Sequence, residues 1–299
     1  MMTAHETGFG PEESNCAEIL IDLAIVEDFG AAGDITSLAT IPQQGMGLAI
    51  FVARSSGVLC GLPVLDRLVR CFDLAEGWLP YLVDGTALSP GDKIAQITGS
   101  MRSILAMERT ALNFLQRLSG VATMTRRFVD LVAGTNAAIL DTRKTTPGWR
   151  SLEKYAVRCG GGQNHRIGLY DAVLIKDNHL AWLKNDLDPI GRAVADAKRL
   201  VPKASFVEIE VDSLEQLDRA LTTRADIILL DNFALLDLTE AVRRRDAAQS
   251  LILLEASGGV NLETVSAIAQ TGVDRISVGA LTHSAPSLDI ALDEGPAQP

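Results

Sequence analysis

The spacing of hydrophobic residues changes character near residue 135. Before that point it predicts a helix over 16–28, capped by Ser14 or Asn15, and then short strands at 47–53, 78–84 and 92–97. A long helical stretch follows at 101–134, where Gly120 is an expected break. This first part of the chain is therefore expected to be a mixed α and β region.

Beyond residue 135, short aliphatic runs alternate with helical stretches. Six such runs occur, at 137–140, 172–175, 206–211, 226–230, 251–256 and 275–279. Several are apolar throughout, as strands covered on both faces are. Alternating strands and helices predict parallel strands joined by crossover helices. Because no GxGxxG follows the first strand and no GxxxxGK[ST] occurs, an α/β barrel, complete or incomplete, fits better than an open dinucleotide-binding sheet.

Composition narrows the class of protein. With 299 residues, 47% of them hydrophobic, the chain can form one large domain or two. A net charge of -11 argues against a nucleic-acid or anionic-membrane surface, which needs a broad basic face. There is no signal-like start, no apolar run of roughly 20 residues and no CxxC pair, so a cytoplasmic protein with reduced thiols is expected.

One segment carries a net positive charge, in contrast to the acidic rest of the chain. Residues 141–179 hold seven Lys or Arg against four Asp or Glu, a local charge of +3, whereas the remaining residues hold 20 basic and 34 acidic side chains. The fork of Arg suits carboxylates, and the compact charge of Lys suits phosphates. The candidates are therefore Arg143, His165 and Arg166 for carboxylates and Lys144 and Lys176 for phosphates. A solvated basic loop is the alternative.

Acidic residues follow in the next strands. Glu208 and Glu210 share one face of the run at 206–211, and Asp231 ends the run after it. Glu210 and Asp231, nearest the strand ends, are the preferred pair for Mg²⁺, sugar hydroxyls or acid/base chemistry. The alternative role of Glu208 is to neutralise the charge of a neighbouring Lys.

Small-residue turns come last. Ser257, Gly258 and Gly259 precede a helix expected to start at Asn261, and Gly279 with Ala280 follows the final strand. Turns after the last strands of α/β barrels commonly bind phosphate. The glycines at 160–162 lie far from a strand end, so they are expected to permit close backbone packing around His165.

Arg109 lies on the apolar stripe of the long helix, and its spacing alone favours a stem that covers the core. Pro147 and Gly148 in TTPGW are typical of a type II turn.

The motifs together resemble one enzyme family. The segment DTRKTTPGWRSLEKYAVRCGGGQNHRIGLYDAVLIKDNH is similar to the signature of the quinolinate phosphoribosyltransferases. Further similar blocks are EDFGAAGDIT, ERTALNFLQRLSG, VEIEVDSLEQL, IILLDN, LEASGGV and DRISVGALTHSAPSLDIAL, so the resemblance covers nearly the whole chain.

The resemblance implies a two-domain α/β fold. An α/β sandwich, expected at 16–125 with about 284–299, precedes an open, seven-stranded α/β barrel of the type II phosphoribosyltransferase kind at 126–283, and 1–15 is expected to be a flexible tail. It also implies a homodimer with shared active sites, with a further assembly to hexamers left open. Arg109 would then reach the substrate in the partner subunit's site.

The resemblance further implies a reaction. Quinolinate and 5-phosphoribosyl-1-pyrophosphate, with Mg²⁺, would give nicotinate mononucleotide, pyrophosphate and CO₂ in NAD biosynthesis. The dicarboxylate is expected on Arg109, Arg143, His165 and Arg166. The phosphoribosyl donor is expected on Lys144, Lys176, Glu210, Asp231, Ser257, Gly258, Gly279 and Ala280. Within this set Lys144, Lys176, Glu210 and Asp231 are the expected catalytic residues, and Glu210 and Asp231 would hold Mg²⁺ directly or through water.

Two other functions remain open from the sequence. Lys176 at a strand end is compatible with a Schiff-base aldolase. A phosphoribosyl-ligand sensor, or a relative with altered specificity, is the second alternative, although the intact RKTTPG and NHR blocks count against it.

Overall fold

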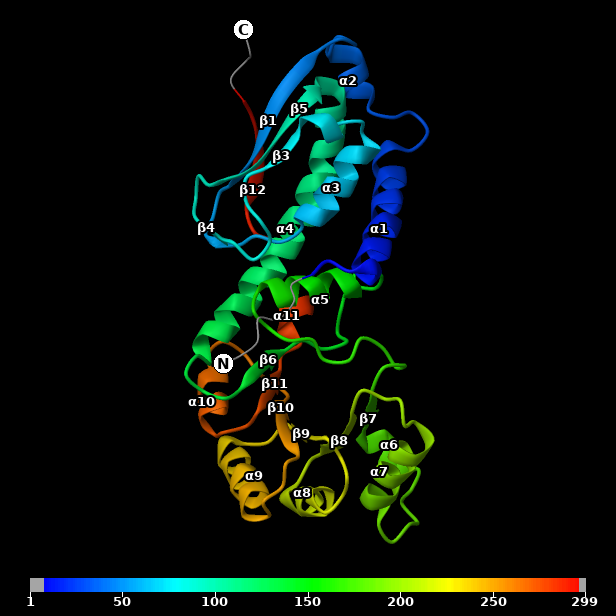
Figure 1. Ribbon diagram of the computed structural model, residues 1–299, viewed down its shortest axis with the longest axis vertical. Coiled ribbons are helices and arrows are strands. Elements are labelled where there is room, and N and C mark those ends of the chain that lie inside the picture. The colour runs from blue at the N-terminus through cyan, green and yellow to red at the C-terminus, as the bar shows by residue number, and fades with distance from the viewer. Residues whose placement is uncertain (1–7, 296–299) are drawn as a thin grey trace. The chain divides into compact units, whose positions relative to one another are not determined.

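Residues 8–295 are described in a computed structural model, and their contacts divide them into two compact units (Figure 1). The first unit runs to residue 126 and also includes 145–161 and the segment from 281 onward; the second comprises 127–144 and 162–280. The segment 145–161, expected from the sequence in the barrel domain, is thus grouped with the first unit by its contacts.

The first unit contains a four-stranded antiparallel sheet. Its strand order is β12 (Ile290–Glu294), β1 (Met46–Ala53), β5 (Lys93–Ser100) and β3 (Trp78–Pro80). Strands β2 (Gly57–Val58) and β4 (Ala87–Leu88) form a separate pair. The helices are α1 (Pro11–Phe29), α2 (Ile35–Thr40), α3 (Leu62–Cys71), the 3₁₀ turn η1 (Ala75–Gly77), α4 (Met101–Leu131), α5 (Arg150–Cys159) and α11 (Ala280–His283). Because β12 pairs with β1, the last segment of the chain completes this sheet.

Helix α1 begins earlier than its sequence pattern indicated. It starts at Pro11, with Gly10 as its N-cap, so Ser14 and Asn15 lie inside the helix and do not cap it. Proline is preorganised for the first helical position, and Glu13 accepts a hydrogen bond from the Gly10 N–H at 2.9 Å. Residues 11–15, assigned from the sequence to a flexible tail, are therefore helical. Residues 1–7 of the expected tail lie outside the described residues, as do residues 296–299.

The expected break of α4 at Gly120 is wrong. The helix is continuous from Met101 to Leu131. A Cβ atom at Gly120 would lie 2.1 Å from the carbonyl oxygen of Pro286. The glycine therefore serves close packing of the chain against the helix and not helix termination.

The second unit contains a parallel sheet with the order β6 (Ala138–Leu140), β11 (Arg275–Ser277), β10 (Leu253–Ser257), β9 (Ile227–Asp231), β8 (Val207–Val211) and β7 (Val173–Ile175). These six strands match the six aliphatic runs. The intervening helices are α6 (Asp177–Ala181), α7 (Pro189–Leu200), α8 (Leu214–Leu221), α9 (Leu235–Ala247) and α10 (Val265–Gln270). The α/β fold class is confirmed.

The seventh strand is reduced to a single residue. Gln163 forms a parallel bridge with Leu140 at the free edge of β6. Its N–H donates to the carbonyl oxygen of Ile139 at 2.8 Å, and its own carbonyl accepts from Asp141 N–H at 3.2 Å. The sequence around it, GGGQNHR, has no aliphatic run, which explains why periodicity did not reveal it.

Helix α10 starts later than expected. Asn261 does accept hydrogen bonds from the N–H groups of Glu263 and Thr264, but they close a turn, and the α-helix begins at Val265. By contrast, the turn at Pro147–Gly148 forms as expected, with Gly148 at φ 83° and a hydrogen bond of 3.0 Å from the Trp149 N–H to the Thr146 carbonyl.

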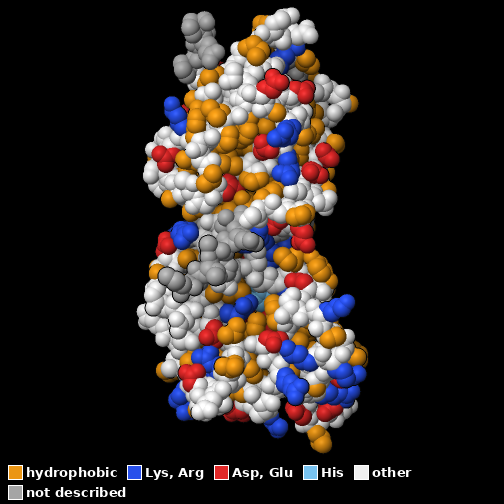
Figure 2. All heavy atoms as spheres, viewed as in Figure 1, with side chains coloured by type: hydrophobic (Ala, Val, Ile, Leu, Met, Phe, Trp, Pro, Cys, Tyr) orange, Lys and Arg blue, Asp and Glu red, His pale blue; other side chains and the backbone are white. Residues whose placement is uncertain are grey.

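The surface of the second unit mixes charges of both signs. Figure 2 shows basic side chains near α6 and α7 with acidic side chains among them. Arg192 pairs with Asp186 at 2.6 Å, and Arg199 pairs with Asp196 at 2.7 Å. Within residues 8–295, no helix is both long and apolar enough to cross a membrane.

Candidate active site

A cavity of about 300 Å³ opens at the carboxyl ends of the parallel strands in the second unit. The two-residue period of a strand explains its composition, since alternate residues face the same side of the sheet. Its lining residues are Thr142, Arg143, Lys144, His165, Arg166, Leu174, Lys176, Glu210, Leu229, Asp231, Glu255, Ser257 and Ser277. The structure thus brings together eight of the twelve site residues predicted from the sequence.

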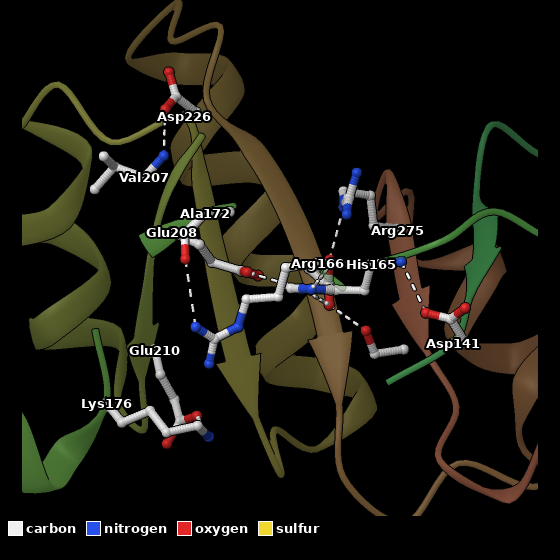
Figure 3. Close-up of polar contacts among 12 residues, drawn as sticks. Asp141, His165, Arg166, Ala172, Lys176, Val207, Glu208, Glu210, Asp226 and Arg275 are labelled. Atoms are coloured by element: carbon white, nitrogen blue, oxygen red, sulfur yellow. Dashed lines mark hydrogen bonds and ion pairs between the residues drawn. The ribbon is translucent and has the colours of Figure 1, made fainter. Parts of the chain in front are cut away.

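The cations of the cavity come from three segments. Arg143 and Lys144 follow β6, and Arg166 precedes β7. Lys176 is the N-cap of α6, directly after β7, and its Nζ lies 2.5 Å from Glu210 Oε2 (Figure 3). Burial, followed by the positive charge of Arg143, lowers the pKa of Arg166. Such mutual repulsion among cations would be relieved by an anion in the cavity.

The segment that carries His165 is fixed by Asp141 at the end of β6. Asp141 Oδ1 accepts from the His165 backbone N–H at 2.9 Å, and Asp141 Oδ2 accepts from the Asn164 side-chain amide at 2.6 Å. The Arg166 backbone N–H donates to His165 Nδ1 at 2.7 Å, and its guanidinium donates to the Ala172 carbonyl at 3.4 Å. Both side chains are thereby held against the sheet.

A buried polar cluster lies behind His165 (Figure 3). His165 Nε2 is 2.8 Å from Glu208 Oε2 and 3.4 Å from Glu255 Oε1. Arg275 Nε donates to Glu255 Oε2 at 2.6 Å, and the Ser277 hydroxyl donates to the other oxygen of Glu255. Both glutamates are fully buried. The partner of Glu208 is therefore a histidine, and not the lysine of the alternative considered from the sequence.

Protonation in this cluster is strongly perturbed. Burial disfavours the imidazolium, but hydrogen bonds to Glu208 and Glu255 outweigh it and raise the pKa of His165 to about 9. Burial, followed by the charge of Glu255, raises the pKa of Glu208. For Glu255, the effect of burial is overcome by His165 and Arg275, so its pKa is lowered. The Arg166 N–H opposes a second hydrogen on the ring, because protonated Nδ1 would face that donor.

Sequence reasoning missed Glu255 and Ser277. A glutamate within the aliphatic run LILLEA was the available signal, because a charge inside a strand covered on both faces needs a buried partner. The partner could not be read from the sequence, since Arg275 and His165 lie in distant segments.

The acidic pair Glu210 and Asp231 lies at the ends of neighbouring strands β8 and β9. Asn232, with φ 57°, donates its side-chain amide to Asp231 Oδ2 at 2.8 Å and its backbone N–H to the Ser257 carbonyl at 2.9 Å. Asn232 therefore connects the ends of β9 and β10.

The remaining predicted residues lie elsewhere. Of the described residues, Gly258, Gly279 and Ala280 are outside the cavity lining, although Gly258 follows the lining residue Ser257. Arg109 belongs to α4 of the first unit, where it lines a separate hollow of about 200 Å³. Gly160 approaches α4 closely, since a Cβ atom there would lie 2.5 Å from the Ala122 carbonyl oxygen.

Comparison with known proteins identifies the family. Residues 121–293 match the quinolinate phosphoribosyl transferase C-terminal domain, and residues 34–119 match the N-terminal domain of the same family. The chain belongs to the quinolinate phosphoribosyltransferase family. This membership favours a phosphoribosyltransferase over the aldolase and sensor alternatives.

Relatives of this family align over nearly the whole chain. A carboxylating nicotinate-nucleotide pyrophosphorylase of Mycobacterium leprae is 46% identical over 283 residues, which cover 94% of this chain and 98% of that protein. The solved nicotinate-nucleotide pyrophosphorylase of Francisella tularensis has a TM-score of 0.85 at 39% identity, covering 94% of this chain and 96% of its own. That of Ehrlichia chaffeensis gives 0.85 at 35% identity, covering 93% and 98%. The quinolinate phosphoribosyltransferase fold therefore extends over both units.

Proposed function

We propose that the protein is a carboxylating nicotinate-nucleotide pyrophosphorylase. It transfers the phosphoribosyl group of 5-phosphoribosyl-1-pyrophosphate to quinolinate, with loss of CO₂, in the de novo synthesis of NAD. The observation that carries the proposal is a single cavity in the second unit that joins a cationic side to an acidic pair. This division matches a dicarboxylate and a phosphorylated sugar, and the relatives named above carry the same activity in their names.

The cationic side is assigned to quinolinate. Arg143, His165 and Arg166 would meet the two carboxylates, for which Arg provides paired hydrogen bonds. Leu174 and Leu229 of the same cavity offer apolar surface to the pyridine ring. An apolar ring with two charged substituents is a good match for this mixture.

The phosphorylated sugar is assigned to the strand ends. Lys144 and Lys176 would neutralise the pyrophosphate, and Glu210 and Asp231 would bind the ribose hydroxyls. The 5-phosphate is assigned to the turns Ser257–Gly258 and Gly279–Ala280, whose backbone N–H groups can donate to phosphate oxygens.

Mg²⁺ fits the same acidic pair. Glu210 and Asp231 supply carboxylate oxygens, the ligands that this ion prefers, and Lys176 limits the excess negative charge at Glu210. When bound, the ion would add positive charge against the leaving pyrophosphate.

The chemistry then requires positioning and electrostatics. The bond from C1 of the ribose to pyrophosphate breaks as the quinolinate nitrogen bonds to C1, and Glu210 and Asp231 place negative charge near the developing positive charge of the sugar. Loss of CO₂ leaves an electron pair on the ring carbon next to the ribosylated nitrogen, whose positive charge stabilises it until a proton from water replaces the carboxylate. No covalent enzyme intermediate is needed.

A direct assay tests the activity. Protein, quinolinate, phosphoribosyl pyrophosphate and Mg²⁺ should yield CO₂ and nicotinate mononucleotide in equal amounts. No turnover, or equal turnover with nicotinate in place of quinolinate, would refute the proposal. Covalent trapping of the substrate on Lys176 by borohydride reduction would instead support the aldolase.

We also propose a homodimer in which Arg109 completes the site of the partner subunit, with the assembly of dimers into hexamers left open. Arg109→Ala and Arg143→Ala proteins should each be inactive, and mixing them should restore part of the activity, since one site of a mixed dimer then lacks both changes. Size-exclusion chromatography and a subunit-exchange control accompany the assay. Confirmed exchange without recovered activity would rule out the shared site.

A further inference from the structure

Two buried glutamates, Glu208 behind the cavity and Glu255 in its lining, have no role in the proposed reaction. Glu208 is fully buried, and apart from His165 no described residue donates a hydrogen bond to either of its carboxylate oxygens. A buried carboxylate with a single hydrogen-bonding partner lowers the stability of the fold. The presence of Glu208 at this position therefore needs a physical reason.

The ring of His165 is held from both sides. Glu208 and Glu255 face Nε2, and the Arg166 backbone N–H faces Nδ1. The acceptor role of Nδ1 places the ring hydrogen on Nε2, between the two carboxylates. Asp141 holds the backbone of the same residue, and the Phe206 ring packs edge-on against the imidazole with centroids 5.6 Å apart. The orientation of the ring is thus fixed.

A metal ion is a weaker explanation for this cluster. The ligand atoms of His165, Glu208 and Glu255 do lie within 4.8 Å of one another. However, Arg275 and Ser277 already occupy the oxygens of Glu255. Arg275 supplies a positive charge beside Glu255, and the Nε2–H of His165 lies between the two carboxylates, so these contacts hold the cluster together without an ion.

We propose that Glu208 and Glu255 are positioning residues that fix the His165 ring and, through Nδ1, the backbone of Arg166 at the floor of the substrate cavity. The proposal rests on the function proposed above, because its consequence is the binding of a dicarboxylate at His165 and Arg166. Neither glutamate needs to touch the substrate.

The free protein gives the first test. Selective ¹⁵N labelling of histidine and long-range ¹H–¹⁵N spectra at neutral pH should show hydrogen on Nε2 of His165, with the signal assigned by its loss in His165→Gln. A ring that carries hydrogen on Nδ1, alone or together with Nε2, would overturn the proposal. This measurement is independent of turnover, so an inactive wild type would refute the proposed function and leave this proposal open to the same spectra.

Kinetics give the second test, with a matched control on the same strand. Glu208→Gln keeps the size of the side chain and removes its charge, and it should raise KM for quinolinate about tenfold while KM for phosphoribosyl pyrophosphate stays within about twofold. Glu210→Gln, two residues along the same face, should show the reverse split. Unchanged KM values, or an equal rise in both for Glu208→Gln, would contradict the positioning role. If that variant does not fold, the wild-type spectra decide.

Discussion

The turn after β10 offers a test that compares two neighbouring glycines. Gly258 has φ 99°, and a Cβ atom there would lie 2.1 Å from Asn232 Oδ1 and 3.0 Å from the Asn232 backbone nitrogen. Gly259 also has a positive φ, 62°, but nothing lies within 4 Å of its Cβ position. Both alanine variants therefore carry backbone strain, and Gly258→Ala alone adds a steric clash.

The magnitudes separate the two variants. A left-handed conformation costs a residue with a Cβ roughly 1–2 kcal/mol, which sets the expected loss of unfolding free energy for Gly259→Ala. Forcing an extra methyl group into an occupied space adds about 1–3 kcal/mol. Gly258→Ala should therefore be destabilised by roughly 2–5 kcal/mol in urea titrations monitored by circular dichroism.

A double-mutant cycle identifies the source of the difference. Asn232→Gly retains the backbone N–H bond to the Ser257 carbonyl and removes the side chain that Gly258→Ala would meet. In the double variant, part of the extra destabilisation should disappear, and the backbone nitrogen at 3.0 Å should preserve the remainder. Equal losses for the two alanine variants, or no coupling with Asn232→Gly, would refute the reasoning.

Two further predictions use other contacts. Arg117→Met should lower the unfolding free energy by about 3 kcal/mol, because the fully buried Glu153 loses an ion pair of 2.6 Å. Adding Glu153→Gln should recover part of the loss, and no recovery would point to another cause. Glu210→Gln should raise the Mg²⁺ concentration for half-maximal activity about tenfold, and an unchanged Mg²⁺ requirement would argue against Glu210 as a ligand.

The strands of the second unit could be predicted because they are buried on both faces. Within the run 226–230, for example, residues 227–230 are all apolar, and Ile227 to Leu230 are all buried in β9. The cavity residues were predictable for a related reason, since residues that follow such runs must lie at one edge of a parallel sheet.

The ends of helices were harder to predict because they depend on contacts between distant segments. Gly120 is a helix breaker by propensity, yet packing against Pro286 keeps it inside α4. Asn261 is a good cap by residue type, but it caps a turn instead of the helix. The local sequence identifies a residue that can cap or break a helix, and tertiary contacts determine whether it does so.

The two glutamates of β8 have different roles because they lie at different positions along the strand. Glu208 and Glu210 share one face and lie about 7 Å apart along the strand. Glu208 pairs in register with Leu174 and Ile227, so it is enclosed, and within residues 8–295 only His165 donates a hydrogen bond to it, whereas Glu210 at the strand end meets the exposed Lys176. The inner glutamate can therefore act only on the ring that it orients, and the outer one remains available to a ligand.

This arrangement also explains how a chain with net charge -11 can present a cationic floor. Charge in a cavity is set by the groups that are shielded from water there, because solvated surface charges are screened over about 10 Å. Glu208 and Glu255 are directed towards His165 and Arg275, so these two carboxylates are already paired, and Arg143 and Arg166 lie on the cavity lining. Neutralising Glu208 should consequently disturb substrate binding through the geometry of the floor, even though it removes a negative charge from beneath an anion.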